Sequence, residues 1–163
     1  MTSRSQIVGE AEALYDRMRT AIQKKDHQHM REIVESTRYD PNRVGGGDQR
    51  TALHTAAQLD DKESLLILLG QATINTNVRT SKGLTPFLLA ASEGNMVAFE
   101  VLSNDNRVDV NALDDEDRSA LVLIRHLRKE IKAAKAKELL EKRNKKRQSV
   151  EEGTNDDDLE DLN

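Results

Sequence analysis

Three groups of residues have types and spacing that could do chemistry. His27 and His29 could form a metal pair, but side chains two positions apart on a helix point about 200° apart, and no third zinc ligand is spaced to join them. The glycines at 45–47 are followed by no Gly-Lys-Ser/Thr, so they do not form a phosphate-binding loop. The acidic run 114–117 lacks the alternating ligands and central glycine of a calcium loop. We therefore expect no metal and no cofactor.

Catalytic residues are also missing from the pattern. The chain contains no Cys, which excludes disulfides, thiolate catalysis and Cys-based zinc sites. No nucleophile has a plausible base beside it, and an enzyme would need a pocket of perturbed groups that nothing in the sequence predicts. We therefore expect a protein without enzymatic activity.

Composition bounds the class of protein. The 163 residues are 33% charged and only 2% aromatic, which favours an aliphatic core between helices and solvated tails. The start of the chain is polar and unlike a signal peptide. The longest apolar runs, such as Leu65–Leu69, have five residues and are far short of the roughly 20 that cross a membrane. We expect one domain plus tails in a soluble monomer of the cytoplasm, the nucleus or both, with no membrane partner.

The elements that must position any functional residue repeat along the chain. The stretch Thr85–Gly94 has a counterpart 34 residues earlier at Thr51–Ala57 and another 34 residues later at Ser119–Leu123 (85 − 51 and 119 − 85). A fixed period of this length with matched apolar positions indicates stacked supersecondary units, each too small to bury its apolar face alone.

The residues of this period resemble the ankyrin repeat family, most closely over residues 49–122. The segments that carry the resemblance are Thr85–Gly94, Val97–Leu102 and Asp109–Ala112 in one copy, and Thr51–Ala57, Ser64–Gly70 and Thr76–Val78 in the copy before it. The resemblance implies an all-α solenoid and a non-catalytic module for protein–protein interaction, such as an adaptor, a scaffold or an inhibitor. It also implies that His54 hydrogen-bonds to loop backbone.

The repeat register predicts the domain organisation. We expect an ankyrin repeat domain over 1–141, with four repeats at about 14–48, 49–82, 83–116 and 117–141. The first and last repeats are degenerate, as terminal caps are expected to be. The paired helices should bury one aliphatic seam that includes Leu66, Leu89 and Val101.

Local signals predict where helices begin and end. A helix is expected over Lys62–Leu69, ended by Gly70 in a left-handed conformation, and its apolar run should be buried on more than one side. Thr85 should accept a backbone hydrogen bond at the start of the next helix, with Pro86 in its first turn.

The C-terminal part of the chain is highly charged. The apolar positions Ile124, Leu127, Ile131 and Ala134 keep helical spacing, but Leu139 and Leu140 are out of phase, which predicts a bend or a second helix near 133–137. Residues 125–147 hold eleven Lys or Arg against three Glu, a net charge of +8, and residues 150–163 hold seven Asp or Glu and no base. We expect 142–163 to form a disordered tail, first basic and then acidic.

The basic run keeps three interpretations open. It could be a solvated helix end, or a nuclear-import or nucleic-acid patch formed by Lys142, Arg143, Lys145, Lys146 and Arg147. It could also be a switch, because Ser149 follows basic residues as a kinase site does. The alternative function is therefore a nuclear, nucleic-acid-associated regulator that uses 125–147 to attract phosphates, without base stacking because no aromatic residue interleaves the charges.

The resemblance also implies where a partner protein would bind. Ankyrin repeats use a concave surface made by loop fingers and first helices, and the matching residues here are Asp48, Arg50, Gln58, Arg79, Lys82, Leu84, Ser92, Glu93, Asp115, Glu116 and Arg118. The second finger is basic and the third is acidic, which would favour a partner with the matching order of charges. Alternatively, these charges only keep the finger tips soluble. Gln49 and Asp117 replace the family's glycine in two fingers, which puts their turn geometry in doubt.

Overall fold

The described part of the chain is entirely helical apart from loops and two isolated β-bridges. In this computed structural model, the backbone is described for residues 4–152 and side chains for residues 9–145. The helices are α1 (Arg4–Lys24), α2 (His27–Val34), α3 (Ala52–Gln58), α4 (Lys62–Leu69), α5 (Pro86–Glu93), α6 (Met96–Ser103) and α7 (Ala120–Glu152). The chain divides into a repeat unit, Met1–Arg125, and a C-terminal unit, His126–Asn163. The predicted all-α fold is confirmed.

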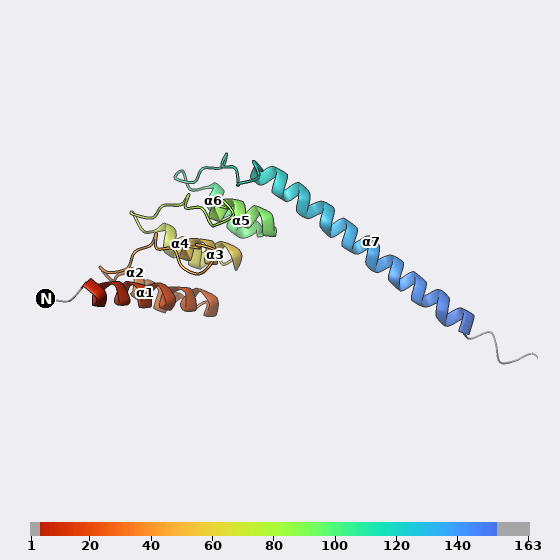
Figure 1. Ribbon diagram of the computed structural model, residues 1–163, viewed down its shortest axis with the longest axis horizontal. Coiled ribbons are helices and arrows are strands. Elements are labelled where there is room, and N and C mark those ends of the chain that lie inside the picture. Colours follow the sequence, from red (N-terminus) through yellow and green to blue (C-terminus); the bar gives the residue numbers. More distant parts are fainter. Residues whose placement is uncertain (1–3, 153–163) are drawn as a thin grey trace, which may run out of the picture. The chain divides into compact units, whose positions relative to one another are not determined.

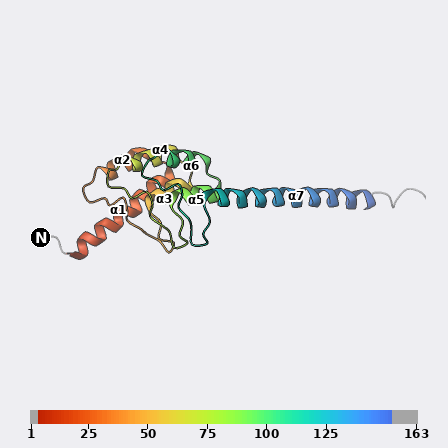
Figure 2. The same ribbon diagram turned by 90° about the horizontal axis from the view of Figure 1, so that it is seen from above.

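Helices of the repeat unit stack in two rows (Figures 1 and 2). α1, α3 and α5 contact one another in order along one row, and α2, α4 and α6 do so along the other. Each helix also packs on its partner in the pairs α1/α2, α3/α4 and α5/α6. Loops project beyond the rows between one pair and the next (Figure 2). The hairpins therefore lie side by side, as the 34-residue period predicted.

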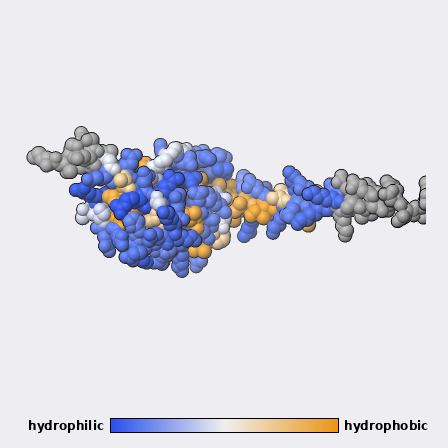
Figure 3. All heavy atoms as spheres, turned by 90° about the horizontal axis from the view of Figure 1, so that it is seen from below, coloured by the Kyte–Doolittle hydropathy of each residue, from blue (hydrophilic) through white to orange (hydrophobic). Residues whose placement is uncertain are grey.

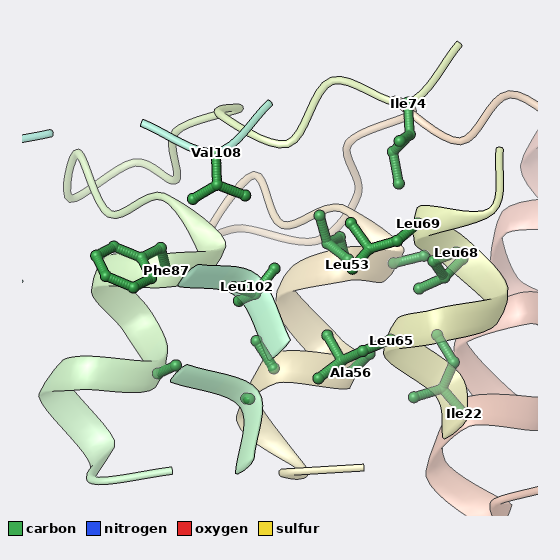
Figure 4. Close-up of a cluster of buried hydrophobic side chains, with 14 of the residues drawn as sticks. Ile22, Leu53, Ala56, Leu65, Leu68, Leu69, Ile74, Phe87, Leu102 and Val108 are labelled. Atoms are coloured by element: carbon green, nitrogen blue, oxygen red, sulfur yellow. The ribbon is translucent and has the colours of Figure 1, made fainter. Parts of the chain in front are cut away.

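The seam between the rows is built from aliphatic side chains of successive repeats (Figure 4). Ile22 of α1, Leu53 of α3, Leu65 and Leu68 of α4 and Leu102 of α6 are fully buried and belong to one cluster. Small residues let the helices approach closely, since the alanine pairs Ala56–Ala57 and Ala90–Ala91 are also buried. At about 25 cal/mol per Å² of apolar surface, this burial is the main contribution to stability.

One residue expected in the seam lies outside it. Leu89 is 2% exposed and Val101 is partly buried against the core, but Leu66 is 48% exposed. The prediction that α4 is buried on more than one side was wrong at Leu66, because a short helix packed on both neighbours still turns one side to solvent. A single exposed leucine is ordinary in a folded protein.

Helix starts follow the predicted capping residues. Thr85 Oγ1 accepts a hydrogen bond from the Leu88 N–H at 3.2 Å, and Pro86 occupies the first turn of α5. Gly94 ends α5 in the left-handed conformation, at φ 76°. The left-handed end predicted at Gly70 was wrong, because Gly70 has φ −63° and its N–H donates to the Leu66 carbonyl, closing one more right-handed turn.

Polar side chains fasten each repeat to the next. The Asn95 side-chain amide donates to the carbonyls of Ala57 and Gln58 at 2.9 and 2.8 Å. The Asp60 carboxylate accepts from the Ala98 N–H at 2.7 Å. Such bonds satisfy helix-end groups that would otherwise be costly to bury, and they fix the register between successive hairpins.

The C-terminal helix is longer than expected and is not interrupted. α7 continues from Ala120 to Glu152, without the predicted break near 133–137, and it includes the residues 142–152 that were expected to begin a disordered tail. Lys, Arg, Glu and Ala favour helix, the sequence has no Gly or Pro between 120 and 152, and Glu138 pairs with Lys142 one turn later at 2.7 Å. The acidic residues 153–163 lie outside the described residues.

None of the helices over the described residues is long and apolar enough to cross a membrane.

Candidate protein-binding surface

Three finger loops precede α3, α5 and α7, and each is closed by backbone hydrogen bonds. Gly45 and Arg50 exchange two bonds in the first finger, at 3.0 and 3.2 Å. The Thr80 N–H donates to the Leu84 carbonyl at 2.9 Å in the second, and the Asp114 N–H donates to the Arg118 carbonyl at 3.1 Å in the third. The fingers are therefore ordered loops of similar construction.

The turn at each finger tip keeps the same backbone conformation despite the loss of glycine in two of them. Gly83 has φ 71°, and its counterparts Gln49 and Asp117 have φ 54° and 57°. All three are left-handed, a conformation that costs a non-glycine residue roughly 1–2 kcal/mol. The doubt about turn geometry is thus resolved, because the surrounding loop bonds hold the two side-chain-bearing residues in the glycine conformation.

Four of the predicted partner-binding residues form one polar chain across two repeats. Arg50 Nη1 donates to Gln58 Oε1 at 2.6 Å, and Gln58 Nε2 donates to Glu93 Oε1 at 3.2 Å. The second guanidinium nitrogen of Arg50 lies 3.4 Å from Asp48. The chain joins the first finger to α3 and then to the end of α5, so these side chains are positioned before any partner arrives.

A tyrosine that the sequence did not single out supports this chain. Tyr15 of α1 donates its hydroxyl hydrogen to the Arg50 carbonyl at 2.8 Å. Burial raises the pKa of Tyr15, so it stays neutral and remains a donor. The degenerate first repeat thereby fixes the backbone of the first finger. Only a tertiary contact over 35 residues reveals this role, and no local spacing could have predicted it.

The second and third fingers bind each other. Arg79 donates to the Leu113 carbonyl at 2.7 Å and pairs with Asp115 at 2.9 Å. The opposite charges of these fingers are therefore partly neutralised within the molecule. Lys82, by contrast, is exposed and makes no ion pair with the described residues. Of the two basic residues predicted in this finger, Lys82 has the charge available to a partner.

The third finger is held by a buried carboxylate. Asp114 pairs with Arg118 at 2.8 Å and accepts hydrogen bonds from the Glu116 and Arg118 N–H groups. Burial acts to raise the pKa of Asp114, but these bonds outweigh it and leave that pKa below its usual value. Arg118 also reaches Glu116 at 3.0 Å. Three acidic or basic residues of the finger are thus engaged internally, and the lowered pKa leaves Asp114 ionised and only weakly basic.

Leu84 and Ser92, also predicted to contact a partner, are partly buried. The Leu84 side chain packs against the core cluster. The Ser92 hydroxyl donates to the Leu89 carbonyl at 2.8 Å. Their partner-binding role, like that of the other predicted residues, stays a prediction. The exposed positions around them are mostly hydrophilic, as is most of the face of the repeat unit drawn in Figure 3.

His54 connects the second repeat to the following finger. Its Nδ1 accepts from the Thr51 N–H at 3.1 Å, so the Nε2 carries the hydrogen and donates to the Leu84 carbonyl at 3.0 Å. Burial lowers the pKa of His54 to about 4, which keeps this ring neutral. The predicted hydrogen bond from His54 to loop backbone is confirmed.

The other two histidines near the N-terminus do not converge. His27 Nε2 lies 2.7 Å from Asp61, whereas His29 lies 3.4 Å from Glu32. Burial acts to raise the pKa of Asp61, but bonds from Ser64 and His27 outweigh it and lower that pKa. His27 therefore serves the contact between the first and second repeats.

The basic segment presents its charges on a helix. Lys142, Arg143 and Lys145 are exposed on α7, while the side chains of Lys146, Arg147 and Ser149 lie outside the described residues. The nuclear-import, nucleic-acid and phosphorylation hypotheses stay predictions.

Comparison with known proteins bears on the repeats. A family model described as ankyrin repeats, in three copies, matches residues 18–114. A search of curated proteins returned no match. The matched segment begins in the last part of α1, includes all of α2 to α6 and reaches the third finger. Since it spans more than half of the 163 residues, the chain belongs to the ankyrin repeat family.

Proposed function

We propose that this protein is a non-catalytic adaptor, scaffold or inhibitor that grips a partner protein with its finger loops and the exposed ends of α3 and α5. Ankyrin repeats generally mediate protein–protein interactions, and their domains are typically non-catalytic. The proposal assigns that general role to one surface of this chain, which we call the finger surface: Asp48, Arg50, Gln58, Lys82 and Glu93.

The polar chain from Asp48 through Arg50 and Gln58 to Glu93 is the observation that carries the proposal. It crosses two repeats through hydrogen bonds of 2.6 and 3.2 Å, and its members remain at least partly exposed. A partner that binds such a surface loses less side-chain freedom, because the side chains are already ordered. Charged groups of this kind set orientation and association rate more than affinity.

Charge reversal tests the surface. The double variant Lys82→Glu, Glu93→Lys removes the free cation and the terminal anion and leaves the net charge unchanged. We expect it to lower the affinity for the natural partner, identified by cross-linking and mass spectrometry, by at least about tenfold. Its melting temperature should stay that of the wild type, because both side chains are exposed. Arg79 is left intact since it holds two fingers together.

A matched control comes from the row formed by α2, α4 and α6, which we call the outer row. Lys62→Glu with Glu100→Lys reverses the same two charges on α4 and α6, where both residues are exposed. This variant should bind as tightly as the wild type. If the control lost affinity and the finger-surface variant kept it, the partner would bind the outer row and the proposal would be wrong.

A second candidate function is nucleic-acid association through 125–147. The observation that favours it is that the basic side chains described in this segment are all exposed on one continuous helix. Binding would rest on phosphate contacts, so it should weaken steeply with salt. Retention on DNA and RNA columns at low salt, measured for the full chain and for a chain ending at 152, tests it. Failure of both proteins to bind would exclude this function.

A further inference from the structure

The last repeat of the stack has only its first helix. In repeats two and three an outer helix, α4 or α6, follows the inner helix, α3 or α5. The residues at 130–137, which stand 34 positions after Met96–Ser103, instead lie within α7 and are all exposed. No described residue of the repeat unit therefore occupies the place of a fourth outer helix.

The repeat register shows what that missing helix would cover on the inner row. Leu53, Phe87 and Leu121 are equivalent, 34 residues apart, and they are 0%, 3% and 66% exposed. Phe87 is covered by the outer helix of its own repeat, since its ring stacks on Phe99 of α6 with the centroids 4.7 Å apart. Leu121 has the same place in its repeat and lacks that cover.

The outer row of helices also ends with apolar side chains that no further helix of the repeat unit covers. Ser64 of α4 contacts Met30 of α2, and α4 also contacts α6; Leu65 and Leu69 of α4 are both buried. The equivalent of Leu65 on α6 is Phe99, which is only partly buried, and Met96, one turn earlier, stands at the place of the exposed Lys62 and is 60% exposed.

The loop between α6 and the third finger repeats the pattern. Val110 is 44% exposed, whereas its equivalent one repeat earlier, Thr76, is 1% exposed. Solenoids normally close with a repeat whose outer face is polar. Here the surface formed by Met96, Phe99, Val110 and Leu121, which we call the end face, is apolar, and no outer helix of the repeat unit covers it.

We propose that the end face binds an amphipathic α-helix of a partner protein, which takes the place of the fourth outer helix. That helix would present aliphatic side chains at i, i+3 and i+4 to the end face, as α4 does within the stack. Its outer flank would be acidic. Arg125 stands one turn after Leu121 on the same side of α7 and is exposed, and it begins the segment 125–147 with its net charge of +8.

A second copy of this chain fits less well. Head-to-tail stacking would bring α2 of one copy onto α6 of another, yet the exposed side chains of α2 are Gln28, Arg31 and Glu32. Two end faces meeting symmetrically would bring the exposed Arg125 side chains of both copies together. Like charges at close approach oppose that arrangement. The end face is separate from the finger surface, so this proposal stands or falls independently of the proposed function.

Selection from a peptide library tests the proposal without a known partner. The library displays helix-forming peptides of about four turns, with aliphatic, acidic and basic residues randomised at every face. Selection on the full-length protein should enrich peptides with aliphatic residues at i, i+3 and i+4 and acidic residues on the flank. Enriched peptides should bind Leu121→Gln and Met96→Gln at least about tenfold more weakly, measured by fluorescence anisotropy. Arg125→Glu should weaken the acidic peptides specifically.

The control is Leu66→Gln, which removes another exposed leucine from α4, away from the end face. It should bind the peptides as the wild type does, and circular dichroism should show that every variant keeps its melting temperature. Equal binding by Leu121→Gln and wild type, enrichment of basic peptides, or no enrichment would each overturn the proposal. If analytical ultracentrifugation showed a dimer that dissociates in the Leu121→Gln variant, a second copy would occupy the end face instead.

Discussion

At the scale of single residues, His54 shows how a buried ring joins two repeats. The neutral ring accepts from Thr51 and donates to the Leu84 carbonyl, so it bridges the start of α3 and the second finger. Protonation would place a hydrogen on the nitrogen that now accepts from Thr51. The bridge therefore depends on the neutral form, and burial lowers the pKa of His54 to about 4.

This arrangement predicts a pH dependence of stability. The folded pKa of His54 lies below the ordinary value of 6.5, so the unfolded chain binds the proton more readily, and stability is lost as pH falls from about 6.5 toward 4. Between pH 7 and pH 5 the free energy of unfolding should fall by about 2 kcal/mol. Urea unfolding of the wild type measures this loss. His54→Gln should lose most of the slope, whereas His126→Gln on α7 should retain it; equal slopes for all three would contradict the assignment.

Gly83 provides a second prediction at this scale. It has φ 71°, and a Cβ there would meet the Asp115 carboxylate and, at 2.6 Å, Arg79 Nη2. Gly83→Ala should therefore lower the free energy of unfolding by roughly 1–2 kcal/mol. Gly47→Ala is the matched control, because nothing lies within 4 Å of a Cβ at that position. Thermal unfolding compares them, and equal melting temperatures would show that the second finger is not held as described.

At the scale of elements, the sequence predicted helices well where signals are local. The bounds of α4 were predicted correctly at Lys62–Leu69, and the start of α5 followed from Thr85 and Pro86. The predicted left-handed end at Gly70 failed because glycine only permits that conformation. Which way the chain turns there is decided by the hydrogen bonds of the following loop.

α7 was misjudged for a different reason. Leu139 and Leu140 do not continue the apolar stripe of the preceding residues. Such a change of phase requires a bend only when both apolar stripes must pack against the same core. Both leucines are exposed, at 67% and 53%, so no core demands the bend. Helix propensity then decides, and Lys, Glu, Ala and Arg continue the helix.

A distance measurement tests the continuity of α7. Spin labels at the exposed positions Lys129 and Lys145 are sixteen residues apart, which at 1.5 Å per residue gives about 24 Å along a straight helix. Double electron–electron resonance should give a narrow distribution near that distance. A clearly shorter or two-peaked distribution would restore the bend near 133–137.

Contacts between fingers could not be predicted from the sequence at all. Arg79 and Asp115 are 36 residues apart, and the sequence showed only that one finger is basic and the other acidic. That pattern suits a partner with matching charges as well as it suits an internal ion pair. Only the stacking of the repeats, which brings equivalent loops side by side, decides between them.

At the scale of the whole molecule, the repeats should unfold together because each buries the seam of its neighbour. Leu88 lies fully buried in α5, in the middle of the seam. Leu88→Ala should lower the free energy of unfolding by about 3 kcal/mol, since it leaves a cavity. Hydrogen exchange should show amides of α3, α4, α5 and α6 destabilised together. Leu66→Ala, on the exposed leucine, should cost well under 1 kcal/mol, and destabilisation confined to α5 would contradict cooperative stacking.

In the repeat unit the helical hairpins pack on one another, and the residues of the finger surface remain at least partly exposed. Photo-cross-linking shows directly whether a partner protein binds the finger surface. A photoreactive amino acid is placed at position 82 in the second finger or at position 62 on α4. Both native lysines are exposed, so neither substitution disturbs the core. We expect a cross-link to the partner protein from position 82 and none from position 62. Cross-linking from position 62 alone would show that the partner binds the outer row of helices and not the finger surface.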